Sequence, residues 1–233
     1  MKRKLKIEIG LAVLLLLIAL FGSFLAPYDP LKVNYDFSLQ PPGLLHIFGT
    51  DKLGRDVLSR ILCGAKTSFG LTFLLLFLIV FIGMIIGLIA GLSNDKAESF
   101  FNNIINGLLA FPDTIFTITI VGIVGAGLFN TVFALALIWW TKYARLTLAL
   151  VKQEKKKSYL VISKMSGVPP LQRIIRYLLP NILSQILVTA FLDIGNMMIS
   201  LAGLSFLGLA SQPPQPEWGA MLYESKQFMQ VAP

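Results

Sequence analysis

The sequence has few charged residues for its length, and this scarcity excludes an ordinary soluble domain. Only 14% of its 233 residues are Asp, Glu, Lys or Arg, whereas 55% are hydrophobic and the mean hydropathy is +0.75. Soluble domains carry about a quarter of their residues as charges. The composition therefore predicts an integral membrane protein.

Residues that hold metals or perform catalysis are also scarce. Cys63 is the only cysteine, which excludes an internal disulfide and a thiolate metal cluster, and His46 is the only histidine. We expect His46 to be solvated or to pack within a loop. No Gly-x-x-x-x-Gly-Lys-Ser/Thr motif, catalytic triad, carboxylate pair or metal-ligand spacing occurs. The sequence therefore indicates a chain that is not an enzyme and holds neither a metal nor a cofactor of its own.

Long apolar runs, in contrast, are abundant. Five of them approach or exceed the length that crosses a bilayer, namely 9–26, 69–92, 102–126, 129–150 and 182–209. Together they predict an all-α fold, a polytopic bundle of about five transmembrane helices. The first run could instead be a signal peptide, but its length and the spans that follow favour an uncleaved helix.

Local features refine this prediction. The third run contains Pro112, so its helix is expected either to kink or to begin late, and 93–99 is expected to form a short loop before it. In the second run, Gly83, Gly87 and Gly91 fall four residues apart on one helix face. Small residues at this spacing favour the close approach of a neighbouring helix.

Basic residues are distributed unevenly around the spans. With the N-terminus inside, the inner segments hold fourteen Lys and Arg residues and the outer segments hold six. This agrees with the positive-inside rule. The net charge of +8 therefore sets orientation rather than indicating nucleic-acid binding, and the N-terminus is expected in the cytoplasm.

A bent, basic polar segment at 152–180 interrupts the apolar sequence. A short helix is expected at 158–166, and Gly167 can adopt the positive φ that ends it. Pro169 and Pro170 then prevent the helix from continuing. The pattern is typical of a helix–turn–helix at the membrane surface. It fits either contact with a soluble partner or an amphipathic segment that rests on anionic lipid.

Asp193 lies near the middle of the fifth run. An acid at this depth is costly in lipid and indicates either a polar pathway or a structural pair, which we expect across a subunit interface. Met197 and Met198 are soft potential ligands in the same run, although methionine packs in membrane helices more often than it binds metal. These alternatives remain open from the residues alone.

Five sequence motifs follow one another along the chain. They are Phe48-Gly49-Thr50-Asp51-x-Leu53-Gly54-Arg55-Asp56-x-x-Ser59-Arg60 with Gly64-Ala65-x-x-Ser68; Phe111-Pro112; Trp140-x-x-Tyr143-Ala144-Arg145; Gly167 followed by Leu179-Pro180-Asn181; and Leu204-Ser205-Phe206-Leu207-Gly208-Leu209 leading to Pro216-Glu217-Trp218-Gly219-Ala220-Met221. In this order and spacing they resemble the motifs of permeases in the peptide/nickel family of ABC importers. The resemblance covers nearly the whole chain from Ala26 onward.

The resemblance implies a type I ABC importer permease fold in a bacterial inner membrane. Residues 1–66 would form an N-terminal transmembrane helix with an extracytoplasmic loop, and 67–233 the transmembrane domain with its cytoplasmic coupling loop at 152–180. Family members carry a sixth helix after the loop that holds Trp218, and the sequence ends without one, so we expect either that the chain is truncated or that this helix lies outside the sequence. The implied partners are a second homologous permease, two cytosolic ATPase subunits that bind ATP and Mg, an extracytoplasmic solute-binding protein and membrane lipid.

The resemblance also implies site residues. Those expected to couple to the ATPase are Tyr159, Ile162, Ser163, Met165, Gly167, Val168 and Pro169, and those expected in the translocation pathway are Asp193, Met197 and Met198. One departure stands out, because Val161-Ile162-Ser163 replaces the Glu-Ala-Ala that family members usually carry in the coupling segment.

The sequence around Asp193 resembles most the nickel branch of this family. The resemblance rests on Leu192-Asp193-Ile194-Gly195-x-Met197-Met198 and on Ser163-x-x-Ser166-Gly167. It implies a pathway for nickel or a metal chelate, with dipeptides or oligopeptides as the alternative. A stand-alone channel or secondary carrier is a further alternative. Carriers generally have internal repeats, which this sequence lacks, and a channel gives no reason for a bent cytoplasmic segment.

Overall fold

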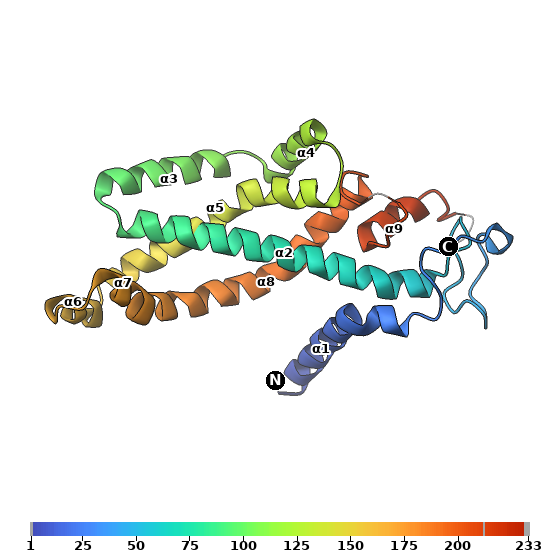
Figure 1. Ribbon diagram of the computed structural model, residues 1–233, viewed down its shortest axis with the longest axis horizontal. Helices are drawn as coiled ribbons and strands as arrows, with labels where there is room; N and C mark the ends of the chain where they lie inside the picture. The colour runs from blue at the N-terminus through green and yellow to red at the C-terminus, as the bar shows by residue number, and fades with distance from the viewer. Residues whose placement is uncertain (1, 212, 231–233) are drawn as a thin grey trace. The chain divides into compact units, whose positions relative to one another are not determined.

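The computed structural model describes residues 2–211 and 213–230, and helices dominate this part of the chain (Figure 1). The elements are α1 (Lys2–Leu25), a 3-10 turn η1 (Tyr35–Phe37), α2 (Val57–Leu92), α3 (Asp95–Leu109), α4 (Asp113–Val124), α5 (Leu128–Lys155), α6 (Ser158–Met165), α7 (Pro170–Arg173), a π turn η2 (Ile174–Leu178), α8 (Leu179–Phe206) and α9 (Trp218–Ser225). The predicted all-α fold is confirmed.

Within the described part of the chain, four helical stretches are long and apolar enough to cross a membrane. They are Lys6–Leu25, Val57–Leu92, Leu128–Lys155 and Pro170–Phe206. The pair formed by α3 and α4 is a fifth candidate, bent by 83°. The number of predicted spans therefore agrees with the structure, although several boundaries do not.

The chain folds as two compact units. One contains the chain up to Thr72, residues 124–131 and the chain from Met198 onward. In this unit α9 packs on the start of α2, where the Trp218 indole Nε1 donates to the Ile61 carbonyl oxygen at 3.0 Å. The α9 backbone also approaches the end of α8 closely, because a Cβ on Gly219 would lie 2.4 Å from the Ala202 carbonyl oxygen.

The other unit contains residues 73–123 and 132–197. Here the glycine stripe of α2 faces α5 directly. A Cβ on Gly83 would lie 2.6 Å from the Trp140 carbonyl oxygen, and one on Gly87 would lie 2.5 Å from the Ala144 carbonyl oxygen. The predicted role of these glycines in close helix packing is confirmed. Helix α3 lies along the same pair of helices (Figure 1), and Lys152 of α5 donates to Glu98 of α3 at 2.8 Å.

Enlarging Gly87 is expected to separate α2 from α5. Gly87→Leu places a side chain where backbone already stands, and overpacking of this kind costs about 1–3 kcal/mol. We expect a lower apparent melting temperature in detergent, measured by loss of monodisperse protein on size exclusion after heating. Gly70→Leu in the same helix is the matched control, since nothing lies within 4 Å of its Cβ position. Equal melting of the two variants would contradict the packing role.

Two predicted boundaries around α2 and α3 are wrong. Helix α2 begins at Val57 rather than at residue 69, and α3 begins at Asp95, so the predicted loop 93–99 shrinks to two residues. Asn94 explains the second difference, because its side chain accepts a hydrogen bond from the Ala97 amide at 3.0 Å and caps the helix. Polar side chains thus started a helix where their polarity had suggested a loop.

The predicted single helix at 102–126 is also wrong. Of the two alternatives expected at Pro112, a kink or a late start, the structure shows the kink. Helices α3 and α4 meet at 83° across this proline. Proline lacks the amide that would continue the hydrogen-bond ladder. Asp113 then opens α4 by accepting from the Thr114 amide at 2.7 Å.

The second helix of the predicted helix–turn–helix and the fifth span form one helical stretch, Pro170–Phe206, whereas the sequence suggested two separate segments, 152–180 and 182–209. Pro180 lies inside it. The π turn η2 ends two residues before this proline, and the Leu179 amide donates to the Ile174 carbonyl oxygen. The wider π turn accommodates the proline ring, which would otherwise clash with the preceding turn.

Candidate functional site

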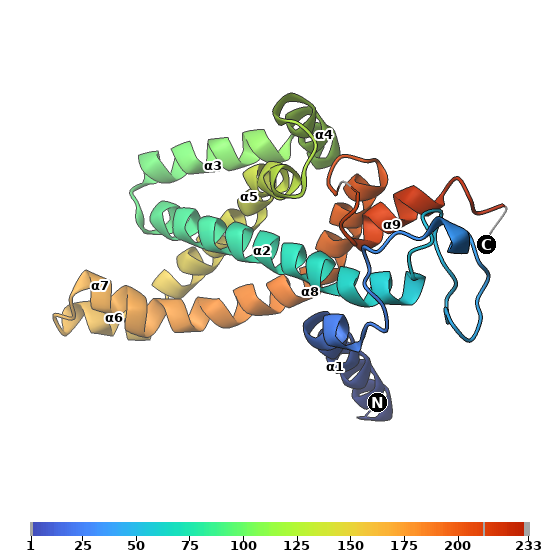
Figure 2. The same cartoon turned by 45° about the vertical axis from the view of Figure 1, so that its right-hand side comes forward.

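The polar segment after α5 forms the helix–turn–helix that the sequence predicted. Figure 2 shows α6 and α7 at the tip where α5 and α8 are connected. Gly167 has a φ of +74°, its amide donates to the Lys164 carbonyl oxygen at 3.2 Å, and the Val168 amide donates to the Ser163 carbonyl oxygen at 3.1 Å. These two bonds are those of a Schellman cap, which ends a helix with a defined change of direction. Gly167 and Pro169 therefore hold α6 and α7 at a set angle.

The coupling residues suggested by the resemblance differ in accessibility. Ile162 and Met165 are 59% and 82% exposed. Ser163 is buried and donates its hydroxyl hydrogen to the Leu160 carbonyl oxygen at 2.8 Å. Tyr159 is partly buried and its hydroxyl donates to the Glu154 carboxylate; burial and then this bond raise the pKa of Tyr159 to about 12.

Large apolar side chains therefore project from a short basic segment. Leu171 and Ile175 are exposed as well as Ile162 and Met165. Exposed apolar side chains gathered in this way are typical of a surface that contacts a protein or a membrane. Within the helix–turn–helix, Ile162 and Met165 are the best-placed residues for such contact, whereas Ser163 supports α6 from within.

A buried polar cluster joins α5 to α8. Oδ2 of Asp193 accepts from the Lys142 ammonium at 2.6 Å and from the Tyr143 hydroxyl at 2.8 Å. Asp193 and Tyr143 are buried, but the Lys142 side chain is 55% exposed. The sequence had left open a pair across a subunit interface, and the structure instead places both partners of Asp193 in the same chain.

The two methionines after Asp193 have different surroundings. Met197 is buried in the core of its unit. Met198 lines a small cavity of about 20 Å³ with Ser68, Glu217 and Trp218. A cavity of this size holds about one water molecule. Burial of Met197 favours the packing interpretation for that residue.

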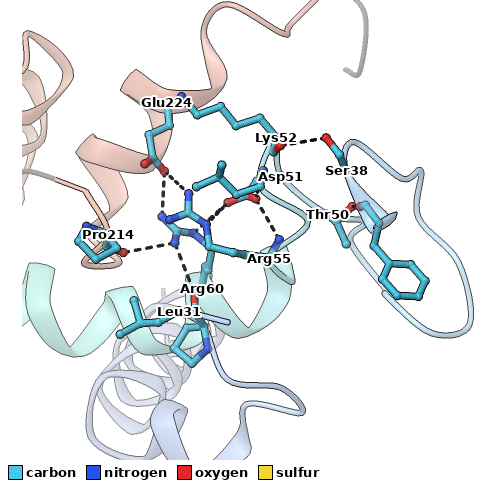
Figure 3. A network of polar contacts seen from close by, with 12 residues as sticks. Leu31, Ser38, Thr50, Asp51, Lys52, Arg55, Arg60, Pro214 and Glu224 are labelled. Atoms are coloured by element: carbon cyan, nitrogen blue, oxygen red, sulfur yellow. Dashed lines mark hydrogen bonds and ion pairs between the residues drawn. The ribbon is translucent and has the colours of Figure 1, made fainter. Parts of the chain in front are cut away.

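A second polar cluster, which the sequence did not predict, ties the loop before α2 to α9 (Figure 3). Glu224 Oε2 accepts from Nη2 of Arg55 and from Nη2 of Arg60, each at 2.9 Å. Asp51 binds Nε of Arg55 at 2.6 Å, and Arg60 also donates to the Pro214 carbonyl oxygen at 3.4 Å. Both guanidinium groups are almost fully buried.

The alternating acids and bases of 46–56 are typical of a solvated surface loop with local ion pairs. The ion pairs are present, but Arg55 and Asp56 are buried, so the expectation of a solvated loop is wrong. Alternating charges indicate ion pairs equally well in a buried or an exposed loop. Here α9 packs over the loop and buries it. His46 packs within the loop as expected, with its ring centroid 4.8 Å from that of Tyr28 and Nδ1 2.8 Å from Asp56 Oδ1. Burial opposes ionisation of Asp56, but hydrogen bonds from Ser59 and His46 outweigh it and hold the pKa of the Asp56 carboxyl below its usual value.

Comparison with known families agrees with the motifs. Residues 83–232 match the family described as the binding-protein-dependent transport system inner membrane component. The chain belongs to this permease family. Residues 9–42 match the N-terminal transmembrane domain of oligopeptide transport permease C, which accounts for α1 and part of the loop that follows it.

Three curated relatives cover most of this permease. A di/tripeptide transport system permease of Pseudomonas aeruginosa is 38% identical over 231 residues, covering 96% of this chain and 76% of that protein. A nickel transport system permease of Escherichia coli is 34% identical over 220 residues, covering 94% and 79%. A glutathione transport system permease of Shigella flexneri is 38% identical over 222 residues, covering 95% and 73%.

These matches confirm the resemblance to the peptide/nickel family of ABC importers. The chain is an inner-membrane permease subunit of an ABC importer and crosses the membrane several times. A subunit of this kind works with ATPase and substrate-binding partners. Its relatives are permeases rather than ATPases, in agreement with the expectation that this chain does not hydrolyse ATP.

Proposed function

We propose that this permease moves a small peptide-like solute along a pathway beside the Lys142–Asp193 pair. The observation that carries the proposal is the pairing itself. Because Lys142 neutralises Asp193, the carboxylate offers little net negative charge to a bare metal cation. The half-exposed ammonium and the adjacent carboxylate instead suit a zwitterion, which carries one charge of each sign.

The relatives support the same substrate class without deciding it. Two of the three are named for di/tripeptide and glutathione transport. Nickel or a metal chelate is the second candidate, supported by the nickel permease relative and by the nickel-type pattern at 192–198. An anionic chelate would interact favourably with Lys142, so this candidate also predicts a role for the pair.

We further propose that α6 and α7 couple this movement to ATP hydrolysis. The N-terminus and the segment 152–180 lie in the cytoplasm, as the distribution of Lys and Arg indicates. Ile162 and Met165 seat in a cytosolic ATPase, and the Gly167 cap transmits closure of the two ATPases to α5 and α8. The complete importer contains a second homologous permease as a heterodimeric partner, two ATPases that bind ATP and Mg, and an extracytoplasmic binding protein.

Uptake measurements test the substrate proposal. In cells that carry the other importer subunits, we expect this chain to restore uptake of a labelled dipeptide or of glutathione at least tenfold better than uptake of nickel. Asp193→Asn is expected to lower that uptake about tenfold, since it removes the buried carboxylate charge that binds both Lys142 and Tyr143. Glu98→Gln is the control, because it breaks an ion pair of similar exposure, that of Glu98 with Lys152, which we place outside the pathway.

Two results would contradict these proposals separately. Better restoration of nickel uptake would replace the peptide by the metal as substrate. Normal uptake by Asp193→Asn, with normal amounts of protein in the membrane, would remove the pair from the pathway whatever the substrate is.

A further inference from the structure

A cavity of about 570 Å³ lies beside α6, in the unit formed by residues 73–123 and 132–197. Its apolar wall includes Leu160, Ile174 and Leu178. Lys155, Lys164 and Arg173 also line it. The volume falls within the range of about 300–1,000 Å³ that is usual for ligand sites. A cavity with an apolar wall and three cationic side chains is suited to an amphiphile that carries negative charge.

These three cations have no acidic partner among the described residues. Lys155 Nζ donates to the Gly91 carbonyl oxygen at 3.1 Å, and neither Lys164 nor Arg173 forms an ion pair there. Nε of Arg173 is shielded from solvent and makes no hydrogen bond to any residue that the structure describes. A buried donor without a partner calls for an acceptor, because leaving it unpaired costs about 1–3 kcal/mol.

Three of the five acids in the same unit already pair with other lysines, and the other two, Asp95 and Asp113, pair with none of the three cations. Glu98 pairs with Lys152, Glu154 with Lys157 and Asp193 with Lys142. The cations around the cavity therefore repel one another with no counter-charge from these carboxylates. An external anion would relieve that repulsion and satisfy Arg173 at the same time.

The position of the cavity along the chain identifies the source of the anion. It lies where three helices of membrane-crossing length end or begin, at Leu92 of α2, Lys155 of α5 and Pro170 of the stretch that continues into α8. The ends of such helices lie at the level of lipid headgroups. Basic pockets between helices at this level bind the headgroups of anionic lipids.

We propose that this cavity binds the phosphate headgroup of an anionic phospholipid, with its acyl chains against the apolar wall. The phosphate accepts hydrogen bonds from Arg173 and Lys164, and Lys155 adds charge from the end of α5. Bound lipid would contact α6 together with the ends of α2 and α5 and would limit the movement of α6. The rigidity of the proposed coupling segment at 152–180 would then depend on membrane composition. The site does not depend on which solute the importer carries.

Lipid retention by the complete purified importer tests the proposal. The assembly is delipidated in mild detergent and titrated with phosphatidylglycerol or phosphatidylcholine, and bound lipid is counted by native mass spectrometry. We expect at least tenfold tighter retention of phosphatidylglycerol, lost in a Lys164→Gln/Arg173→Gln double variant. The matched control, Lys156→Gln/Arg176→Gln, removes one lysine and one arginine that do not line the cavity and should stay within twofold of wild type.

Three outcomes would overturn the proposal. Equal loss in the control variant would mean diffuse attraction to a basic surface. Competition by inorganic phosphate at the same concentration as the lipid would make the site one for free phosphate. If the ATPase subunit fills the cavity in the absence of lipid, the anion that binds there would be a carboxylate of that protein. A Lys164→Arg/Arg173→Lys variant that keeps its charge and its fold should retain phosphatidylglycerol, which separates binding from misfolding.

Discussion

Replacing Glu224 with glutamine is expected to destabilise the unit that joins α9 to the start of α2. One carboxylate oxygen binds both Arg55 and Arg60 at 2.9 Å, and both guanidinium groups are almost fully buried. Removing its charge leaves two buried like charges with only Asp51 between them. Breaking a buried ion pair in this way typically costs about 3–5 kcal/mol.

The loss should appear as a clearly lower melting temperature of the purified importer in detergent. Asp36→Asn is the matched control, since it neutralises an exposed acid in the segment before α2 that also holds Asp51 and Arg55. Arg55 offers a complementary position for substitution, because its Nη1 atom is buried and has no hydrogen-bond partner among the described residues. If Glu224→Gln had the same melting temperature as the control variant, the cluster would contribute nothing to stability.

Replacing Gly167 with valine is expected to uncouple ATP hydrolysis from uptake. The residue has a φ of +74°, a conformation that costs an L-residue with a side chain about 1–2 kcal/mol, and more when the side chain is branched at Cβ. No described residue has an atom within 4 Å of its Cβ position, so the effect comes from the backbone alone. The Schellman cap would open and α6 would lose its fixed direction.

We expect uptake to fall at least tenfold and the ATPase subunits to be lost on purification. Gly167→Asn is the control, because asparagine tolerates positive φ and should keep most of the activity. If Gly167→Val supported uptake at the wild-type rate, the proposed role of the Gly167 cap in transmitting ATPase closure to α5 and α8 would be excluded. If it lost uptake but kept the ATPases, the segment would transmit motion without supplying the docking energy.

The helix–turn–helix was predictable because its signals are local. Gly167 followed by Pro169 and Pro170 stops one helix and starts another whatever surrounds them, and the observed cap follows that order. The glycine stripe of α2 was predictable for a similar reason, since helical periodicity alone places Gly83 and Gly87 on one face. The start of α3 was missed because a capping asparagine resembles a loop residue until the helix behind it is known.

The polar clusters were less accessible. Asp193 was identifiable as an acid in a span, but its partner Lys142 lies 51 residues earlier in the chain. Glu224 is 169 residues from Arg55, and no pattern in the loop before α2 indicates that α9 will cover it. Burial of Ser163 likewise depends on what packs against α6, which its own sequence does not specify.

The amino-acid order alone thus determined the helical class, the approximate spans, the bent polar segment at 152–180 and the resemblance to peptide/nickel permeases. Run length, helical period and backbone preference are properties of neighbouring residues. Only the tertiary structure decided which charges are buried, which are paired and which surround an open cavity with no counter-charge. The cost of a charge depends on the groups that exclude water from it, and in this protein those groups come from distant parts of the chain.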